Sequence, residues 1–134
     1  EAIMLTQAGN VSEGSAENIF LVQGDTLITP AKGENILVGI TRNAVMELAH
    51  EELGIRTIER NVARSELYSS DEVFLCGTGA QISPVTEIDR RKVGTGVVGP
   101  ITRRLQDAYF GAVRGENPKY ASWVRPVLGA GAAH

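Results

Sequence analysis

Two short segments of the sequence have the residue types that could hold a phosphate group. In the first, Gly39 precedes Ile40, Thr41 and Arg42 where we expect a helix to begin. The first N–H groups of a helix have no partner inside it and lie at the positive end of its dipole, so an anion placed there is stabilised without a lysine. Taken alone, this segment is better explained as an ordinary capped helix start.

The second segment is Gly77-Thr78-Gly79, which follows a predicted buried strand. Its two glycines allow the backbone to approach a ligand closely, and the threonine adds a hydroxyl and an amide. No Lys-Ser or Lys-Thr pair follows, so this is not a Walker-type loop, and the third glycine and the helix of a Rossmann fingerprint are missing. Alone, such a segment is most often a bulge or a turn.

The remaining reactive side chains indicate no second kind of chemistry. Glu13 lies between strand signals, where a carboxylate is usually just solvated. Cys76 has no histidine near it in the sequence, so a buried strand cysteine is a better interpretation than a nucleophile. His50 lies off the apolar face of its predicted helix, and His134 ends the sequence. Two isolated histidines without suitably spaced carboxylates do not make a metal site, so we expect no metal.

Composition favours one folded domain or part of one. Hydrophobic residues make up 43% of the 134 residues, and the net charge of −3 gives no electrostatic footprint for nucleic acid. No apolar run approaches the ~20 residues that a membrane helix needs, so no membrane partner is expected. The single cysteine and the lack of a secretory signal suit the cytoplasm. The sequence enters the apolar stretch 2–5 at once, so we expect a fragment that starts inside a strand.

The periodicity of apolar residues predicts strands and two helices. Strands are expected over 2–6, 18–23, 26–29, 55–62, 72–75 and 84–88, with Pro30 ending the third of them and 90–92 forming a turn. A helix is expected over 41–53, with Thr41 as its N-cap and Gly54 as its stop, and a second helix opens at Gly99-Pro100. Strands on both sides of one good helix, joined by hairpin signals, favour an α+β fold with a mainly antiparallel sheet.

Taken in order, these segments resemble the motifs of the branched-chain amino acid aminotransferases, which have the fold type IV architecture. The segments that carry the resemblance are 13–20, 29–30, 39–42, 71–80, 84–85 and 99–102. The resemblance implies that residues 1–127 are a C-terminal, cofactor-binding large domain whose N-terminal domain is missing. It also implies a mainly antiparallel sheet or pseudo-barrel with flanking helices, and 128–134 are expected to be a frayed tail.

The resemblance implies that pyridoxal 5'-phosphate is the cofactor and gives five residues a role in binding it. Glu13 matches the carboxylate that meets the pyridine nitrogen, where an anion keeps the ring protonated and able to accept electrons. Leu37 matches the aliphatic residue on the ring face. Ile40 and Thr41 match the phosphate site at the helix start, and Thr78 adds a further hydroxyl to that phosphate.

The resemblance also gives a substrate site, but it gives no catalytic residue in this sequence. The amides of Thr78 and Gly79 match the pair that receives the substrate carboxylate. The Schiff-base lysine is expected upstream of Glu13, in a segment that this sequence does not contain. Lys32, Lys92 and Lys119 have no buried apolar surroundings that would depress the pKa of an amine for this chemistry. These three are the lysines that follow Glu13.

The activity implied is transfer of the amino group of leucine, isoleucine or valine to 2-oxoglutarate by the full-length enzyme, with the fragment alone inactive. The expected partners are amino acid and 2-oxo acid substrates, the missing N-terminal segment, and further copies in a homodimer or higher homo-oligomer. Two alternatives stay open. A D-amino acid aminotransferase or aminodeoxychorismate lyase would share the fold, and a cofactor-binding module without catalysis would explain the missing lysine.

Overall fold

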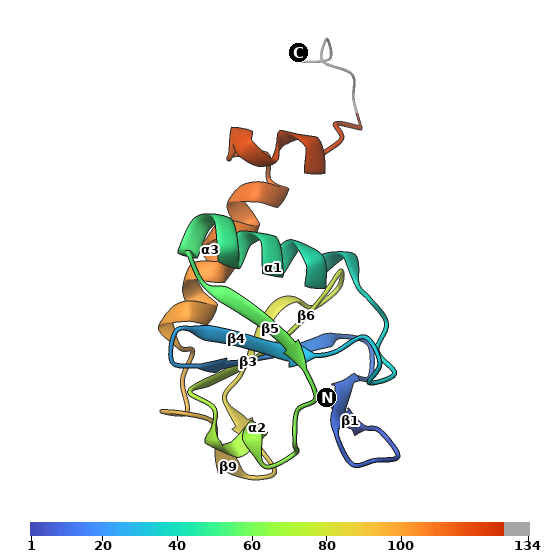
Figure 1. Ribbon diagram of the computed structural model, residues 1–134. Coiled ribbons are helices and arrows are strands. Elements are labelled where there is room, and N and C mark those ends of the chain that lie inside the picture. Colours follow the sequence, from blue (N-terminus) through green and yellow to red (C-terminus); the bar gives the residue numbers. More distant parts are fainter. Residues whose placement is uncertain (128–134) are drawn as a thin grey trace.

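A five-stranded sheet forms the centre of the computed structural model, which describes residues 1–127 (Figure 1). Its strands, in spatial order, are β5 (Arg56–Arg60), β4 (Thr26–Pro30), β3 (Asn18–Gln23), β6 (Glu72–Gly77) and β7 (Gln81–Val85). All neighbours are antiparallel except β4 and β5, which are parallel. Parallel strands need a long crossover, and α1 (Ile40–Leu53) provides it. The expected, mainly antiparallel sheet is therefore confirmed.

The hairpin between β3 and β4 forms as the sequence predicts, with one difference at Pro30. Gln23 pairs with Thr26 across the Gly24-Asp25 turn. Pro30 does not end the strand early but is its last paired residue, opposite Arg60 in β5. It can occupy this position because the next residue, Ala31, donates its N–H to the Arg60 carbonyl, so no donor is required of the proline.

Two helices cover one face of the sheet. These are α1 and α3 (Pro100–Val113), which lie on the same side in Figure 1. The rings of Phe20 and Phe74, which are paired across β3 and β6, stack with centroids 5.1 Å apart beneath them. The apolar side chains between sheet and helices belong to Phe20, Val22, Leu27, Val45, Leu48, Phe74, Cys76, Ile82, Leu105 and Tyr109. Gly54, in the left-handed conformation, ends α1 as predicted.

A second apolar cluster lies on the opposite face, under short elements. These elements are β1 (Ile3–Leu5), β2 (Val11–Gly14), α2 (Glu66–Ser69), β8 (Glu87–Ile88) and β9 (Arg91–Lys92). The single strand expected over 84–88 is instead two strands in different sheets. The turn expected over 90–92 is shifted, because Asp89 and Arg90 take up positive φ and Arg91 pairs with Ile88. Strand β2 was not predicted, since its polar residues break the apolar alternation.

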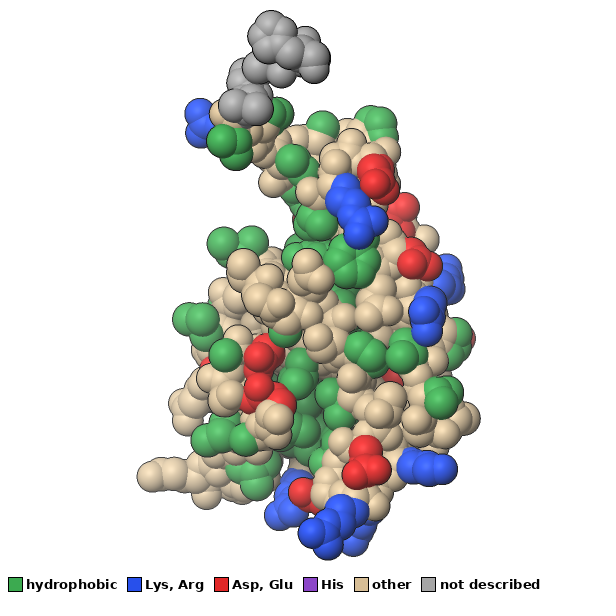
Figure 2. Space-filling view, turned by 180° about the vertical axis from the view of Figure 1, so that it is seen from behind, with side chains coloured by type: hydrophobic (Ala, Val, Ile, Leu, Met, Phe, Trp, Pro, Cys, Tyr) green, Lys and Arg blue, Asp and Glu red, His purple; other side chains and the backbone are tan. Residues whose placement is uncertain are grey.

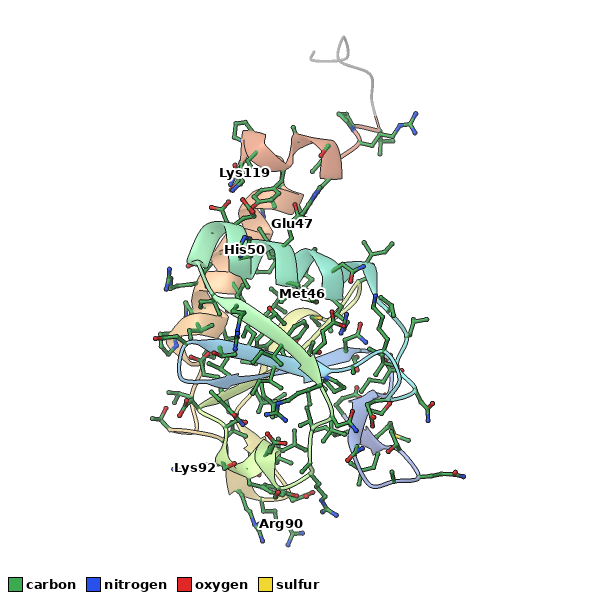
Figure 3. All side chains as sticks on the ribbon, in the orientation of Figure 1. Met46, Glu47, His50, Arg90, Lys92 and Lys119 are labelled. Atoms are coloured by element: carbon green, nitrogen blue, oxygen red, sulfur yellow. The ribbon has the colours of Figure 1, made fainter. Side chains whose placement is uncertain are left out.

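A 3-10 segment, η1 (Pro118–Trp123), follows α3 and was also not predicted. It is held to the C-terminal end of α1 by Tyr120, whose hydroxyl donates to Glu52 at 2.7 Å. The rings of Tyr120 and Trp123 are 4.6 Å apart. Figure 3 shows Lys119 at this end of the molecule together with His50.

The described strands form three separate sheets, with β5 and β7 as open edges of the largest, so the pseudo-barrel that the resemblance implied is not seen within residues 1–127. The expected tail, 128–134, lies outside the described residues. No helix in the described part of the chain is long and apolar enough to cross a membrane. Arg90 and Lys92 mark the lower end of the molecule (Figure 3), and basic side chains gather at that end when it is seen from behind (Figure 2).

Candidate functional site

The six residues to which the resemblance gave binding roles all line one hollow of about 460 Å³. They are Glu13, Leu37, Ile40, Thr41, Thr78 and Gly79. They come from β2, from the loop that precedes α1, from the first turn of α1 and from the turn after β6. The pairing of Asn18 with Cys76 brings the start of β3 beside the end of β6, and so brings these segments together. The volume is in the range usual for small-molecule sites, about 300–1,000 Å³.

Glu13 is held through one of its two carboxylate oxygens. Its Oε2 accepts hydrogen bonds from Asn18 Nδ2 and from the backbone N–H of Leu37, both at 3.0 Å. Its Oε1 has no hydrogen-bond partner among residues 1–127. The carboxylate is therefore not simply solvated. It is oriented by two donors, with one oxygen left for a ligand in the hollow.

Within residues 1–127, no side chain accepts a hydrogen bond from the N–H groups in the first turn of α1. The helix begins at Ile40, and Gly39 is its N-cap, without any side-chain cap or acidic residue in the first turn. The prediction that Thr41 is the N-cap was wrong. The first helical bond runs from Asn43 N–H to the Gly39 carbonyl, so Thr41 lies inside the first turn. Its hydroxyl is thereby freed from capping, and Thr41 is one of the residues that line the hollow beside the helix start.

The start of α3 has a similar sequence but is occupied by an anion of the chain itself. Glu72, which is buried, accepts hydrogen bonds from Ile101 N–H at 3.0 Å and Thr102 N–H at 2.7 Å. The Thr102 hydroxyl donates to the same carboxylate at 2.6 Å. A side chain on Gly99 would collide with it, since a β-carbon there would lie 2.0 Å from Glu72 Cδ. The chain thus neutralises the dipole of α3 and leaves that of α1 facing the hollow.

The turn after β6 forms the opposite wall of the hollow. Strand β6 extends to Gly77, two residues beyond the predicted end at Leu75, and pairs there with Gln81. Thr78 and Gly79 lie in the turn between them and are exposed. The Gly-Thr-Gly segment is a strand turn, as expected for such a motif, and it lies against the same hollow as the start of α1.

Among residues 1–127, no amine or thiolate lines the hollow. Cys76 is a wall residue, but it is buried, and desolvation raises the pKa of its thiol to about 12, so it stays protonated. Lys119 pairs with Glu51 at 2.9 Å, on the surface near the C-terminal end of α1. Lys32 and Lys92 are exposed elsewhere. None of the three lysines touches the hollow.

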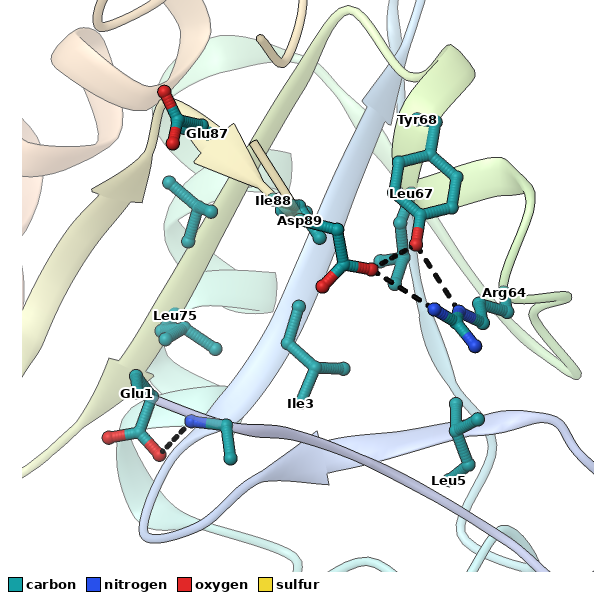
Figure 4. A pocket seen from close by; sticks show the side chains of 12 residues that line it. Glu1, Ile3, Leu5, Arg64, Leu67, Tyr68, Leu75, Glu87, Ile88 and Asp89 are labelled. Atoms are coloured by element: carbon teal, nitrogen blue, oxygen red, sulfur yellow. Dashed lines mark hydrogen bonds and ion pairs between the residues drawn. The ribbon is translucent and has the colours of Figure 1, made fainter. Parts of the chain in front are cut away.

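A second hollow, of about 570 Å³, lies under β1 on the other face of the sheet and contains none of the predicted site residues (Figure 4). Its walls are polar and apolar in about equal measure, and a network of three side chains stands on one side. Arg64 pairs with Asp89 at 3.1 Å, and the Tyr68 hydroxyl donates to the same carboxylate. These contacts, led by that of Tyr68, lower the pKa of Asp89. Within residues 1–127, no three histidine, cysteine or acidic side chains gather closely enough to hold a metal ion.

Comparison with known proteins gives one consistent family. The family described as amino-transferase class IV matches residues 1–88. A probable branched-chain-amino-acid aminotransferase from Aquifex aeolicus is 55% identical over 127 residues, which are 95% of this chain and 41% of that protein. The branched-chain-amino-acid aminotransferase of Escherichia coli is 44% identical over the same share of this chain. The chain spans about two fifths of the length of these relatives.

Solved structures agree with this result. The branched-chain amino acid aminotransferase from Thermobaculum terrenum in PLP-form superposes with a TM-score of 0.88 at 45% identity, over 91% of this chain and 40% of that one. The enzyme from Thermoproteus uzoniensis with norvaline gives a TM-score of 0.90 at 44% identity, over 96% of this chain and 42% of that one.

Proposed function

We propose that this chain, which belongs to the amino-transferase class IV family, is the cofactor-binding part of a branched-chain amino acid transaminase. The whole protein would transfer the amino group of leucine, isoleucine or valine to 2-oxoglutarate with pyridoxal phosphate. One observation carries the proposal. Residues from four separate segments meet in a single hollow that has an open helix start on one side and an oriented carboxylate on another.

The residues of the hollow fit pyridoxal phosphate group by group. The N–H groups at the start of α1, with the hydroxyls of Thr41 and Thr78, are suited to the phosphate. Glu13 Oε1 is available for a protonated ring nitrogen. Leu37, whose side chain is 76% exposed, offers an apolar surface to the ring. When bound, the cofactor supplies a ring that accepts electrons from the substrate.

We propose that the turn after β6, which borders the proposed phosphate site, also binds the substrate carboxylate. The amides of Thr78 and Gly79 would receive the substrate carboxylate, since adjacent exposed N–H groups in a turn bind anions. We propose that the catalytic lysine belongs to a part of the whole protein outside this chain, because no lysine here lines the hollow. This chain would then bind and orient the reactants, and the proton at the substrate Cα would be moved by a group from elsewhere.

The larger assembly is also proposed from this surface. Leu37, Val38 and Ile40 at the hollow are 76%, 41% and 88% exposed, which leaves apolar side chains for another domain or subunit to cover. We propose a homodimer or a higher homo-oligomer. The open edges at β5 and β7 leave room for further strands, so a pseudo-barrel remains our proposal for the whole protein. The single cysteine, buried and reduced, suits a cytoplasmic location.

The test uses the whole protein that contains this chain. Pyridoxal phosphate is titrated by equilibrium dialysis, and amino transfer to 2-oxoglutarate is then measured from L-leucine, L-isoleucine, L-valine and D-alanine. We expect binding, with turnover of the three branched L-amino acids. Turnover of D-alanine alone, or cleavage of aminodeoxychorismate, would assign the fold to one of the two alternative reactions. Binding without turnover of any substrate would support a non-catalytic module.

A further inference from the structure

Asn18 is a buried polar residue at the start of β3, a position for which neither the motifs nor the comparisons give a role. It is 7% exposed and begins the otherwise apolar run of β3. A buried amide costs free energy unless its donors are paired. Both N–H bonds of its Nδ2 are used, one to Glu13 Oε2 at 3.0 Å and one to the Leu37 carbonyl at 2.7 Å.

These bonds close a ring of contacts among three residues. Glu13 Oε2 accepts from Asn18 and also from the Leu37 N–H, while the Leu37 carbonyl accepts from Asn18. The carboxylate and the backbone of Leu37 are therefore fixed to the same amide group. Glu13 is the proposed partner of the cofactor's pyridine nitrogen, and Leu37 has the side chain proposed to cover the face of the pyridine ring. The same amide group therefore fixes both residues.

The other end of the Asn18 amide limits the residue before α1. Its Oδ1 faces Gly39, and a β-carbon on Gly39 would lie 2.5 Å from that oxygen, closer than such contacts allow. The backbone of Asn18 pairs with Cys76, directly before the turn that contains Thr78. One side chain thus touches β2, the loop before α1 and the N-cap of α1, from a strand position adjacent to the remaining wall of the hollow.

We propose that Asn18 is a positioning residue that locks Glu13, Leu37 and the start of α1 into one rigid cofactor cradle. The inference rests on the proposed function. It adds that the spacing between the ring-nitrogen carboxylate and the ring-face leucine is set by the Asn18 amide, which lines the hollow but spends both of its N–H donors on these two residues. Only a side chain with two donors can make both contacts, because a carboxylate at this position would face the Glu13 carboxylate and the Leu37 carbonyl.

The main test compares Asn18→Asp with Thr29→Val in the whole protein. Asp keeps the shape of Asn but replaces both donors by an acceptor. Thr29→Val is a matched control, since it removes another buried hydrogen bond of the same sheet, from the Thr29 hydroxyl to the Ile19 carbonyl at 2.8 Å, away from the hollow. Two quantities are measured: the dissociation constant of pyridoxal phosphate by equilibrium dialysis, and the absorption maximum of the bound cofactor.

We expect Asn18→Asp to weaken binding roughly 10- to 100-fold and to shift the absorption maximum, because a buried contact becomes repulsive. Thr29→Val should lower the unfolding temperature and leave both readouts unchanged. The inference is overturned if Asn18→Asp binds within twofold of the parent, or if both variants weaken binding equally. Should Asn18→Asp not fold, Asn18→Ala is measured in its place, and it should again weaken cofactor binding more than Thr29→Val does.

A double-mutant cycle with Glu13→Gln separates this inference from the proposed function. If Asn18 acts through Glu13, the effect of Asn18→Ala on binding should be smaller in the Glu13→Gln background than in the parent. Equal effects in the two backgrounds would contradict the inference. If Glu13→Gln leaves the absorption maximum unchanged, the ring-nitrogen role in the proposed function fails. If Glu13→Gln shifts it and the Asn18 variants do not, only the role of Asn18 fails.

Discussion

The carboxylate of Glu72, at the start of β6, lies over the N-terminus of α3 and accepts the Thr102 N–H at 2.7 Å. The equivalent position at α1 is capped by no carboxylate from the described part of the chain. Two helices with glycine N-caps and threonine in the first turn therefore differ in one respect that matters for binding. The first has its anion supplied internally, and the second is left to receive one from outside.

Replacing Glu72 with glutamine should destabilise the fold without changing the affinity for pyridoxal phosphate. The substitution removes the carboxylate charge and replaces one acceptor oxygen by an NH2 group, which would face the donors at the start of α3. We therefore expect a loss of about 1–3 kcal/mol in the free energy of unfolding, measured by urea denaturation. Glu116→Gln, at an exposed position after α3, is the control and should have no measurable effect. A loss of equal size in both variants would contradict a capping role for Glu72.

Removing the two hydroxyls of the proposed phosphate site should weaken cofactor binding strongly. We expect Thr41→Val combined with Thr78→Val to cost roughly 3–6 kcal/mol, because each hydroxyl would lose a hydrogen bond to a charged group. Equilibrium dialysis of the whole protein measures the change. Thr95→Val changes an exposed threonine away from the hollow and serves as the control. Unchanged affinity in the double variant would show that the cofactor phosphate is not bound at this position.

Glu13→Gln should retain the cofactor but slow the removal of the substrate Cα proton. A neutral amide no longer holds the ring nitrogen protonated, so the ring becomes a poorer electron acceptor, and we expect a decrease on the order of 10²-fold or more. The rate is measured in a single half-reaction with L-leucine by rapid mixing. A glutamine variant with the parent rate would show that Glu13 has only a structural role.

The ion pair between Arg42 and Glu59 should contribute to stability through the burial of the arginine. Arg42 is 1% exposed, and its Nη2 contacts Glu59 at 2.8 Å and the Pro30 carbonyl at 3.2 Å. We expect Glu59→Ala to lower the free energy of unfolding by about 1–3 kcal/mol, less than for a fully buried pair, since Glu59 is partly exposed. Arg42→Met in the Glu59→Ala background should recover part of that loss. Further destabilisation by the second change would contradict this account.

Acid should weaken the link between β5 and α2. Two hydrogen bonds from Arg60, at 2.6 and 3.0 Å, are the main cause that lowers the pKa of Glu66 from its ordinary value of 4.5 to about 2. A carboxyl group with a lowered folded-state pKa stabilises the protein above its unfolded pKa, and this contribution is lost as pH falls from about 4.5 toward 2. At this partly exposed pair we expect ~1 kcal/mol. The stability of Glu66→Gln should therefore decline less steeply than that of the parent over this pH range, as measured by the unfolding temperature.

Much of the fold and of the hollow could be predicted from sequence, and the failures have physical causes. The hairpin of β3 and β4 and the end of α1 at Gly54 follow from local turn chemistry, so they were predicted correctly. The convergence of Glu13 with Thr78 needs the register of β3 against β6, which spacing alone does not give. It was predicted only through the family resemblance, and the hollow contains both residues.

The residues that were missed are buried polar groups whose partners are distant in sequence. Asn18 and Glu72 each begin an apolar strand, where a polar residue is read as a boundary. Asn18 bonds to Leu37, 19 residues away, as well as to Glu13, five residues away, and Glu72 bonds to Thr102, 30 residues away, so no helix or strand periodicity reports these contacts. The misplaced cap at Thr41 has a different cause. Threonine is a favoured N-cap, and only the extended backbone of Gly39 shows that the cap lies two residues earlier.

The pairing of Asn18 with Cys76 has a consequence for how the protein folds. The two halves of the hollow are separated along the chain and have no means of meeting until β3 and β6 are aligned. A disordered chain therefore has no affinity for a ligand that needs both halves. Such a ligand acts by mass action on the folding equilibrium, and at 100 times its dissociation constant it would shift that equilibrium by about 2.7 kcal/mol. The supply of cofactor during synthesis would then help to determine how much of the chain reaches its folded state.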